Sequence, residues 1–197
     1  MYQRVLQGFE KAWGPDHTST LDTINNLGNL YKNQGKLVEA EQMYQRALQG
    51  FEKVWGPDHT STLNTVNNLG LLYTNQGKLV KAEQMYQRAL HGYEKALGLE
   101  LVLSYLPALN TMFVLGDLFS QTDRKDMAKA MYNRALSGFT TVQGPSSNQC
   151  RQLQDRLQAL QVVSAVVGRS NKFTEPEVAK SQSFKQKFCK LGRRLST

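Results

Sequence analysis

Apolar residues recur at helical spacing along the first 145 residues, in segments separated by short polar turns. In residues 1–13, Tyr2, Leu6, Phe9 and Trp13 fall at i, i+4, i+7 and i+11, which predicts an amphipathic helix. The segment 20–34 carries a similar apolar stripe, and the segment 37–55 carries another. Two amphipathic helices joined by a tight turn at Gly35 predict an antiparallel helical hairpin.

The ends of these helices carry recognisable signals. Gly14-Pro15 ends the first helix, because proline disfavours helical geometry in the residue before it. Ser19 together with Asp22, or Thr20 alone, is expected to cap the second helix. Gly28 lies inside that helix beside its stripe. Glycine there costs about 1 kcal/mol relative to alanine, so we expect a neighbouring helix to approach closely.

The pattern repeats with a period of 42 residues. Residues 43–84 match residues 1–42 at 35 of 42 positions, and a looser third copy follows from Met85. The predicted hairpins pair Leu63–Gln76 with Leu79–Leu97, and Leu106–Gln121 with Lys125–Val142. The third unit is four residues longer, so we expect an extended or extra-turn connector, with Pro107 in the first turn of the next helix. A regular repeat of this size indicates a stacked array.

After the third hairpin the repeat pattern ends, and a single amphipathic segment and a basic segment follow. Leu153, Leu157 and Leu160 form a last apolar stripe with glutamine and arginine on the outer face, as expected of a helix that closes an array. We therefore divide the chain into 1–17, the second helix of a truncated repeat; 18–145, three repeats; 146–166, a capping helix; and 167–197, a basic tail expected to be disordered.

The distribution of charge and the two cysteines argue against several classes of function. Of the net charge of +8, most lies in residues 165–197, which hold eight lysines and arginines and two glutamates, so the repeats are nearly neutral. The aromatic residues lie on packing stripes, which argues against nucleic-acid binding. Cys150 and Cys189 form no metal-binding spacing, and nothing indicates a cofactor. Without a signal peptide or an apolar run long enough to cross a bilayer, we expect a cytoplasmic protein.

The spacings match the tetratricopeptide signature W-x2-L-G-x2-Y…A-x3-F. In the first unit it reads Ile24-x2-Leu27-Gly28-x2-Tyr31 with Ala40-x3-Tyr44, and the second and third units repeat it. The chain therefore resembles tetratricopeptide-repeat proteins. Its 42-residue period and W-G-P-D-H turn resemble the kinesin light chain type, and the near-identity of adjacent copies is similar to the C-terminal arrays of fungal NACHT or NB-ARC repeat proteins. Asp123 departs from the glycine at positions 35 and 77.

The resemblance implies an all-α, right-handed superhelical solenoid of antiparallel hairpins whose first helices line a concave groove. It implies no enzymatic activity, and a protein or an extended peptide as partner. The polar positions between the apolar stripes would then line the groove. The candidates for peptide binding are Asp22, Asn25, Asn29, Lys32, Asn64, Asn67, Leu71, Asn110, Phe113 and Asp117.

Asparagines dominate this set. An amide side chain offers two donors and two acceptor lone pairs, so a ladder of amides can hold a peptide backbone without reading its sequence. Alternatively, the pairs Asn25/Asn26 and Asn67/Asn68 are solvated, brace adjacent helices or are copied with the repeat. Lys32 is the only groove cation, which disfavours the carboxylate clamp of chaperone-binding arrays. Phe113 either forms an apolar pocket or is covered by the capping helix or the inserted connector.

Several other features favour structural roles. We interpret His17 and His59 as copied turn residues, and Trp13 and Trp55 as core or interface residues. In the tail, Arg193-Arg194-Leu195-Ser196 has the form of a phosphorylation site at Ser196, and Phe184, Phe188, Leu191 and Leu195 could form a basic amphipathic helix that touches an anionic membrane or an acidic partner. Two other functions stay open: a spacer or self-association module that joins further repeats of a longer chain, and the sensor end of a fungal signalling receptor.

Overall fold

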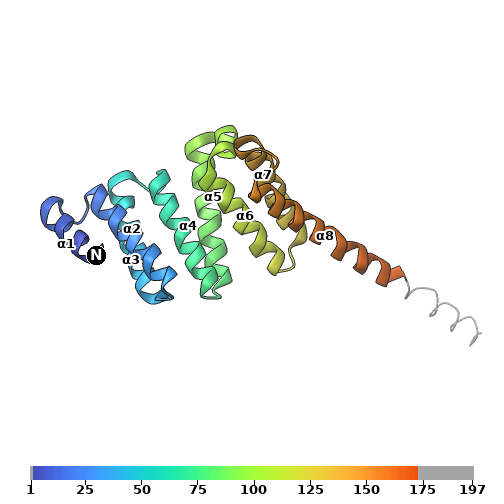
Figure 1. Ribbon diagram of the computed structural model, residues 1–197, viewed down its shortest axis with the longest axis horizontal. Helices are drawn as coiled ribbons and strands as arrows, with labels where there is room; N and C mark the ends of the chain where they lie inside the picture. The colour runs from blue at the N-terminus through green and yellow to red at the C-terminus, as the bar shows by residue number, and fades with distance from the viewer. Residues whose placement is uncertain (1, 173–197) are drawn as a thin grey trace, which may run out of the picture. The chain divides into compact units, whose positions relative to one another are not determined.

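The chain folds into helices throughout the part that the structure describes. The computed structural model describes residues 2–172, and the side chains of residues 4–161 (Figure 1). Its elements are α1 (Tyr2–Trp13), α2 (Thr18–Asn33), α3 (Leu37–Trp55), α4 (Thr60–Asn75), α5 (Leu79–Leu101), the 3₁₀ helix η1 (Val102–Ser104), α6 (Leu106–Gln121), α7 (Lys125–Gln143) and α8 (Asn148–Lys172). The expected all-α repeat fold is confirmed.

The chain divides into two compact units, residues 1–154 and 155–197, and the boundary falls within α8. In the first unit α2 packs with α3, α4 with α5, and α6 with α7. These three hairpins follow one another along the unit, with α3 against α4 and α5 against α6 (Figure 1). Lone helix α1 packs against α2.

Each hairpin closes around a glycine in its first helix. A Cβ atom at Gly70 would lie 2.6 Å from the ring of Tyr86, and one at Gly116 would lie 2.6 Å from the ring of Tyr132. Both tyrosines are at most 1% exposed. The prediction of a close helix approach at Gly28 is confirmed, because a Cβ there would lie 2.7 Å from the ring of Tyr44.

The turns inside the hairpins share one backbone conformation. Gly35 and Gly77 have φ values of 74° and 71°, the left-handed region that suits glycine. The departure at Asp123 preserves the geometry at a higher energy, since this aspartate has φ 57°. The third turn is therefore built like the first two despite its different sequence.

The expected cap of α2 is wrong. The helix begins at Thr18, and His17 is its N-cap, with Nδ1 accepting from the amide of Ser19 at 3.3 Å. Thr20 lies inside the helix, where its hydroxyl donates to the carbonyl oxygen of Gly14 at 2.9 Å. His59 caps α4 in the same way.

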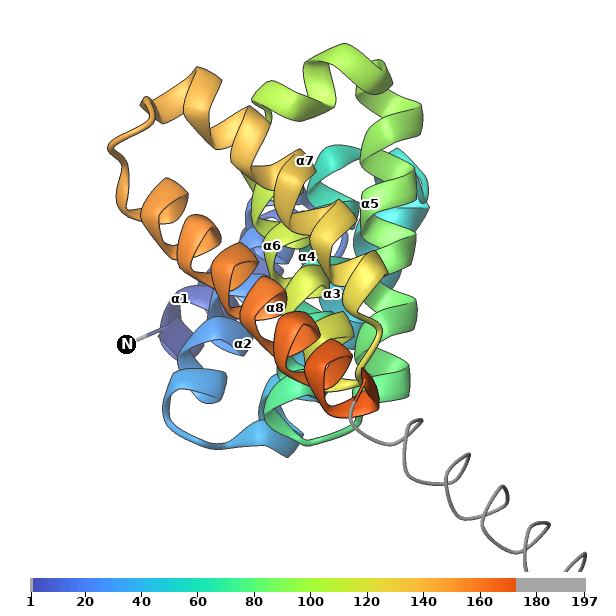
Figure 2. The same ribbon diagram turned by 90° about the vertical axis from the view of Figure 1, so that its right-hand side faces the viewer.

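The extra residues of the third unit form helical turns. Helix α5 continues past a break at Gly98, which has φ 79°, and η1 follows it (Figure 2). Buried Val102 anchors this connector, and Pro107 lies in the first turn of α6 as expected. The prediction of an extra-turn connector is confirmed.

Helix α8 extends to Lys172, beyond the expected end of the capping helix at residue 166, so the first residues assigned to the tail are helical. Ser196 and the basic amphipathic stretch from Phe184 to Leu195 lie outside the described residues.

A row of ion pairs joins the second helices of successive repeats. Each pair links a glutamate of one helix to an arginine of the next, and the pairs are Glu10–Arg46, Glu52–Arg88 and Glu94–Arg134. All six side chains are partly exposed, so each pair contributes little to stability alone. Their regular spacing follows the stacking of neighbouring hairpins.

Candidate functional site

The first helices α2, α4 and α6 are joined side to side by asparagine and threonine side chains. Asn25 accepts from the amide of Asn68 at 3.2 Å, and its oxygen lies 3.3 Å from the hydroxyl of Thr65. One repeat further on, the oxygen of Asn67 lies 2.9 Å from the hydroxyl of Thr111. Each of these hydroxyls has a single proton, which it shares between the asparagine and a carbonyl oxygen of its own helix, that of Ser61 or Pro107. Asn25, Asn67 and Asn68 therefore brace adjacent helices, as the alternative interpretation of these asparagines proposed.

Two more asparagines bond to tyrosine hydroxyls from the second helices. The hydroxyl of Tyr44 donates to Asn29 at 2.7 Å, and that of Tyr93 donates to Asn64 at 2.6 Å. Burial raises the pKa of both Tyr44 and Tyr93, so these hydroxyls keep their protons at physiological pH. In the third unit Tyr132 donates to Asp117 at 2.7 Å, and a carboxylate can only accept.

These contacts orient the amides. In Asn29 and Asn64 the amide oxygen accepts from a tyrosine hydroxyl, in Asn25 it accepts from the amide of Asn68, and in Asn67 it faces the hydroxyl of Thr111. In the part of the chain that the structure describes, no residue accepts a hydrogen bond from the nitrogen atoms of these four side chains, all of which are half-buried. Each amide nitrogen thus remains available to a ligand that brings an acceptor. We call these four side chains the amide row, and its amide nitrogens are hydrogen-bond donors.

The charged candidates lie at different depths on α2. Asp22 is exposed and has no tyrosine hydroxyl beside it, since position 51 is phenylalanine where position 93 is tyrosine. Partial burial raises the pKa of the Asp22 carboxyl. Lys32 is half-buried, and burial lowers the pKa of its ammonium group.

The third unit differs from the other two. Asn110 is exposed. The residue that corresponds to Tyr93 in the third repeat is Phe139, which has no hydroxyl to bond to Asn110. Phe113 replaces the bracing asparagine and is half-buried, with its ring edge-on to Tyr132 at 6.2 Å between centroids. Leu71 of the second unit is also half-buried. Leu71 and Phe113 supply the apolar part of the candidate set.

Sequence reasoning missed the groups that orient the amides. The predicted site lacks Tyr44, Tyr93, Thr65 and Thr111, because the apolar stripe predicts packing for its ring residues and the helical period gives no role to the threonines. A signal was present in the repeats: Thr23, Thr65 and Thr111 occupy one repeat position, and a polar residue recurs at that position where the stripe is otherwise apolar.

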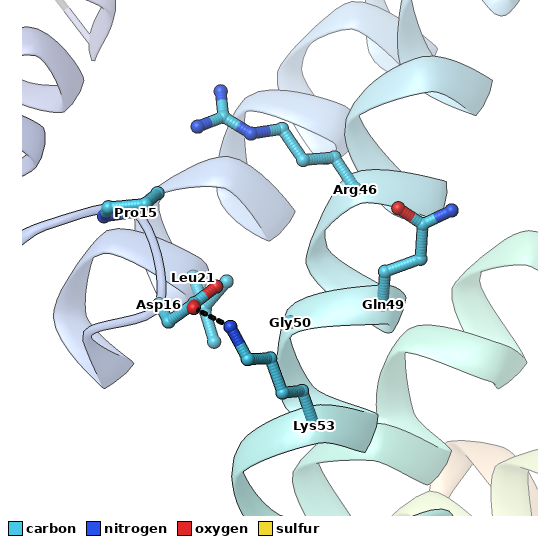
Figure 3. A pocket seen from close by; sticks show the side chains of 7 residues that line it. All are labelled: Pro15, Asp16, Leu21, Arg46, Gln49, Gly50 and Lys53. Carbon is cyan, nitrogen blue, oxygen red and sulfur yellow. Dashed lines mark hydrogen bonds and ion pairs between the residues drawn. The ribbon is translucent and has the colours of Figure 1, made fainter.

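A pocket of about 250 Å³ lies between the turn that precedes α2 and the C-terminal half of α3 (Figure 3). It is lined by Pro15, Asp16, Leu21, Arg46, Gln49, Gly50 and Lys53. Lys53 pairs with Asp16, and Arg46 pairs with Glu10, so both cations are neutralised within the protein. The pocket therefore presents no unpaired charge to an anionic ligand.

A more apolar pocket of about 230 Å³ lies between α5 and α7, with α6 at its base. Its lining includes Leu90, Leu115, Phe119, Met127 and Met131. In the preceding repeat the counterparts of Phe119 and Met127 are Tyr73 and Lys81, and that lysine lies 5.6 Å above the tyrosine ring. The third repeat has lost this covering lysine.

The tryptophans are not core residues. Trp13 is 53% exposed and Trp55 is 36% exposed, and each packs against the histidine that caps the next helix, Trp13 on His17 at 4.8 Å and Trp55 on His59 at 4.4 Å. These histidines therefore serve as caps and ring partners. In the described part of the chain no cluster of histidine, cysteine and acidic residues could hold a metal ion.

Within residues 2–172 no single helix is long and apolar enough to cross a membrane. The bent pair of α5 and α6 passes such a test by length and composition only. Its apolar side chains include Tyr86, Leu109 and Met112, which are buried in the core of the repeats.

Comparisons with solved structures identify repeat proteins of the same fold. BtubC (BKLC) from P. vanneervenii aligns with a TM-score of 0.72 at 18% identity, over 93% of this chain and 72% of that one. A putative kinesin light chain of Podosopora anserina with nearly identical TPR-like repeats aligns at 0.67 and 16% identity, over 94% and 85%. The N-terminal domain of stress-induced protein-1 from C. elegans aligns at 0.53 and 18% identity, over 73% and 96%.

Comparisons of sequence give the family. No curated protein sequence matches the chain. Two family models, both described as tetratricopeptide repeat, match residues 1–53 and 19–95, and residues 109–137. Together these matches cover more than half of the chain, and the structural neighbours include kinesin light chain-like repeats. The chain belongs to the tetratricopeptide repeat family.

Proposed function

We propose that the chain is a non-catalytic, cytoplasmic scaffold that holds an extended peptide of a partner protein against α2, α4 and α6. The fold is in general a protein-interaction scaffold. The observation that carries the proposal is the row of oriented amides at Asn25, Asn29, Asn64 and Asn67, whose oxygens are bonded within the protein. Amide donors match the carbonyl acceptors that recur along a peptide backbone.

The free energy of these hydrogen bonds indicates which further contacts the peptide must make. A hydrogen bond contributes a net of about 0.5–1.5 kcal/mol, so four would contribute about 4 kcal/mol. That corresponds to a dissociation constant of roughly 1 mM before any further contact. Useful affinity therefore needs apolar side chains on the peptide, placed to meet Leu71 and Phe113, which are half-buried. Lys32 can attract one carboxylate of the ligand. A single lysine does not form a carboxylate clamp, which needs several cations.

The test removes the donors while keeping the internal hydrogen bonds. In Asn29→Asp with Asn64→Asp, each carboxylate still accepts from its tyrosine, as Asp117 does from Tyr132. Peptides would be selected from a random phage-displayed library on the unaltered chain and measured by calorimetry. We expect them to bind the double variant at least tenfold more weakly, while the thermal midpoint changes little.

The matched control is Asn133→Asp, which makes the same change at an exposed position of α7. It should leave peptide binding unchanged. If the selected peptides bound the double variant as tightly as the unaltered chain, the amide row would not be the binding site.

The alternative is a spacer or self-association module, or the sensor end of a larger fungal signalling receptor. It is favoured by the exposed apolar residues on α1, Val5 at 38% and Trp13 at 53%. Light scattering at increasing protein concentration separates self-association from peptide binding. A mass that rises with concentration supports self-association.

A further inference from the structure

The connector that lengthens the third unit exposes leucines where α5 ends and α6 begins. We call Leu99, Leu101 and Leu106 the leucine patch, and these residues are 71%, 63% and 39% exposed. Leu99 and Leu101 lie in the turn after the break at Gly98, and Leu106 opens α6 (Figure 2). The 3₁₀ turn between them advances the chain only about 2 Å per residue, so all three leucines lie at one end of the third unit. Single exposed leucines are ordinary on a protein surface, but three so close together are not.

The backbone that carries the leucine patch is held in place by packing. Val102, the first residue of η1, is fully buried, and η1 packs against α5, α6 and α7. The carbonyl oxygen of Leu103 lies so close to Gly138 that a Cβ there would come within 2.5 Å of it. The ring of Tyr105 is edge-on to that of Tyr93, with 5.3 Å between centroids. The leucines are therefore presented by packed backbone, which lowers the entropy cost of binding through them.

The earlier repeats have a polar surface at this place. The turns after α1 and α3 read Gly-Pro-Asp-His, and their aspartates, Asp16 and Asp58, pair with Lys53 and Lys95 of the following second helix. In the third unit the connector replaces this turn, and the counterpart of the two lysines is Thr141, which is exposed. Both members of the ion pair are thus replaced, and leucines occupy a surface that is charged in the other repeats. An exposed apolar surface of this kind is typical of a binding site.

The charges around the leucine patch indicate the chemistry of its partner. Glu100 lies between Leu99 and Leu101, is exposed, and forms no ion pair within the part of the chain that the structure describes. Lys95, the nearest lysine in the sequence, is paired with Asp58 at 2.5 Å. From residue 96 to residue 123 the sequence has no lysine or arginine, although the whole chain has a net charge of +8. A ligand with a lysine or an arginine at the edge of its apolar face would complement this surface.

Two other occupants fit these observations less well. In a symmetric contact between two copies, the patch would face itself, so two Glu100 carboxylates would approach each other within an apolar contact. Three leucines also cover much less than the roughly 800 Å² that each partner of a stable interface buries. An anionic membrane attracts lysine and arginine, and residues 96–123 contain neither. A short apolar ligand surface with a cation at its edge fits better.

We propose that the leucine patch binds an amphipathic helix of a partner protein. Apolar side chains of that helix pack on Leu99 and Leu101, and a lysine or an arginine beside them pairs with Glu100. A helix suits a patch of this size, because an apolar stripe on a helix returns to the same face every three to four residues. This site lies on the connector and does not depend on the amide row of the proposed function.

The test uses two labelled synthetic peptides of about 18 residues, long enough to form a helix. Both have leucines along one face, and the other positions are lysine in the first peptide and glutamate in the second. Binding to the 197-residue chain would be followed by fluorescence anisotropy. We expect the lysine peptide to bind at least tenfold more tightly, although the net charge of +8 favours the opposite order. In Leu99→Ser with Leu101→Ser, binding of the lysine peptide should fall at least tenfold while the thermal midpoint changes little.

The matched control is Val38→Ser with Val80→Ser, which changes two valines that are 66% and 72% exposed on α3 and α5. It should bind the lysine peptide as the unaltered chain does. Equal binding by the leucine variant, or tighter binding of the glutamate peptide, would overturn the proposal. So would a concentration-dependent dimer that the leucine variant dissociates, because the occupant would then be a second copy.

A second pair of variants separates this site from the proposed function. Asn29→Asp with Asn64→Asp should leave binding of the lysine peptide unchanged, since both residues lie outside the connector. Loss of binding in that variant would place the peptide on the amide row and contradict the proposal. Glu100→Gln should reduce the preference for the lysine peptide over the glutamate peptide, and an unchanged preference would exclude the predicted ion pair.

Discussion

At the scale of single residues, glycines determine where helices meet. Gly70 admits the ring of Tyr86, and the ring atoms would lie 2.6 Å from a Cβ there. Gly8 has the same residue type in a helix but no neighbour within 4 Å. Replacing glycine by alanine should therefore change the stability in opposite directions at the two positions. Alanine has the higher helix propensity at both, but only at Gly70 would its Cβ overlap a neighbouring side chain, the ring of Tyr86.

The variant Gly70→Ala tests this difference. Overpacking a core costs about 1–3 kcal/mol, and the gain in helix propensity returns roughly 1 kcal/mol. We expect a net loss of up to about 2 kcal/mol in the free energy of unfolding, measured by urea denaturation followed by circular dichroism. Gly8→Ala should keep or raise the urea midpoint. If both variants lost stability equally, close packing would not explain the glycine at position 70.

The side chains of the candidate site were partly predictable at this scale. The polar positions of the first helices follow from the 3.6-residue period, which is why Asn25, Asn29 and Asn67 were identified. Their orientation was not predictable, because it depends on hydroxyls from other helices, such as Tyr44 in the same hairpin and Thr111 in the next repeat. Periodicity within one helix holds no information on those partners.

At the scale of elements, the turns and caps fix each hairpin. Gly35 and Gly77 adopt the left-handed conformation without strain, and Asp123 adopts it with a side chain. Asp123 also pairs with Lys125 at 3.0 Å, but this aspartate side chain is 84% exposed, so the pair adds little. The third turn therefore carries a backbone cost that the other two avoid.

Restoring glycine in Asp123→Gly should stabilise the protein. Left-handed geometry costs a residue with a side chain roughly 1–2 kcal/mol, although aspartate tolerates it better than most and glycine loses more chain entropy on folding. We expect a net gain of about 0.5 kcal/mol, seen as a higher thermal midpoint in calorimetry. A lower midpoint would mean that the ion pair with Lys125 outweighs the backbone cost. The variant Lys125→Ala measures that ion pair alone and serves as the control.

The elements themselves were largely predictable, and the exceptions have local causes. The helices follow from the apolar stripes, and the connector from the four extra residues before Pro107. The cap of α2 was missed because histidine is not a usual N-cap residue, and its ring is held there by Trp13 at 4.8 Å. That contact joins the end of one helix to the start of the next, and the residue preferences of N-caps do not predict it.

At the scale of the molecule, the interfaces between repeats hold the array together. Glu41 of α3 accepts from the hydroxyl of Tyr73 at 3.1 Å and from the amide of Gln76 at 3.1 Å, both in the next hairpin. Glu83 of α5 forms a bidentate pair with Arg124 at 2.7 Å on both oxygens, and the guanidinium lies 4.5 Å from the centroid of the Phe119 ring. In each case one carboxylate connects a repeat to the next.

Acid should weaken these connections. Hydrogen bonds and charge from Arg124 hold the pKa of Glu83 below its usual value of 4.5, against a smaller opposing effect of burial. For a carboxyl whose pKa is lower in the folded state, the stabilisation is complete above the unfolded pKa and is lost as pH falls through the folded value. We therefore expect the thermal midpoint to fall progressively as the pH is lowered below about 4.5. Glu83→Gln should be less stable at pH 7 and should lose less on acidification than the unaltered chain, because glutamine does not titrate. Equal acid losses in the two proteins would show that Glu83 is not among the groups that couple the repeats to pH.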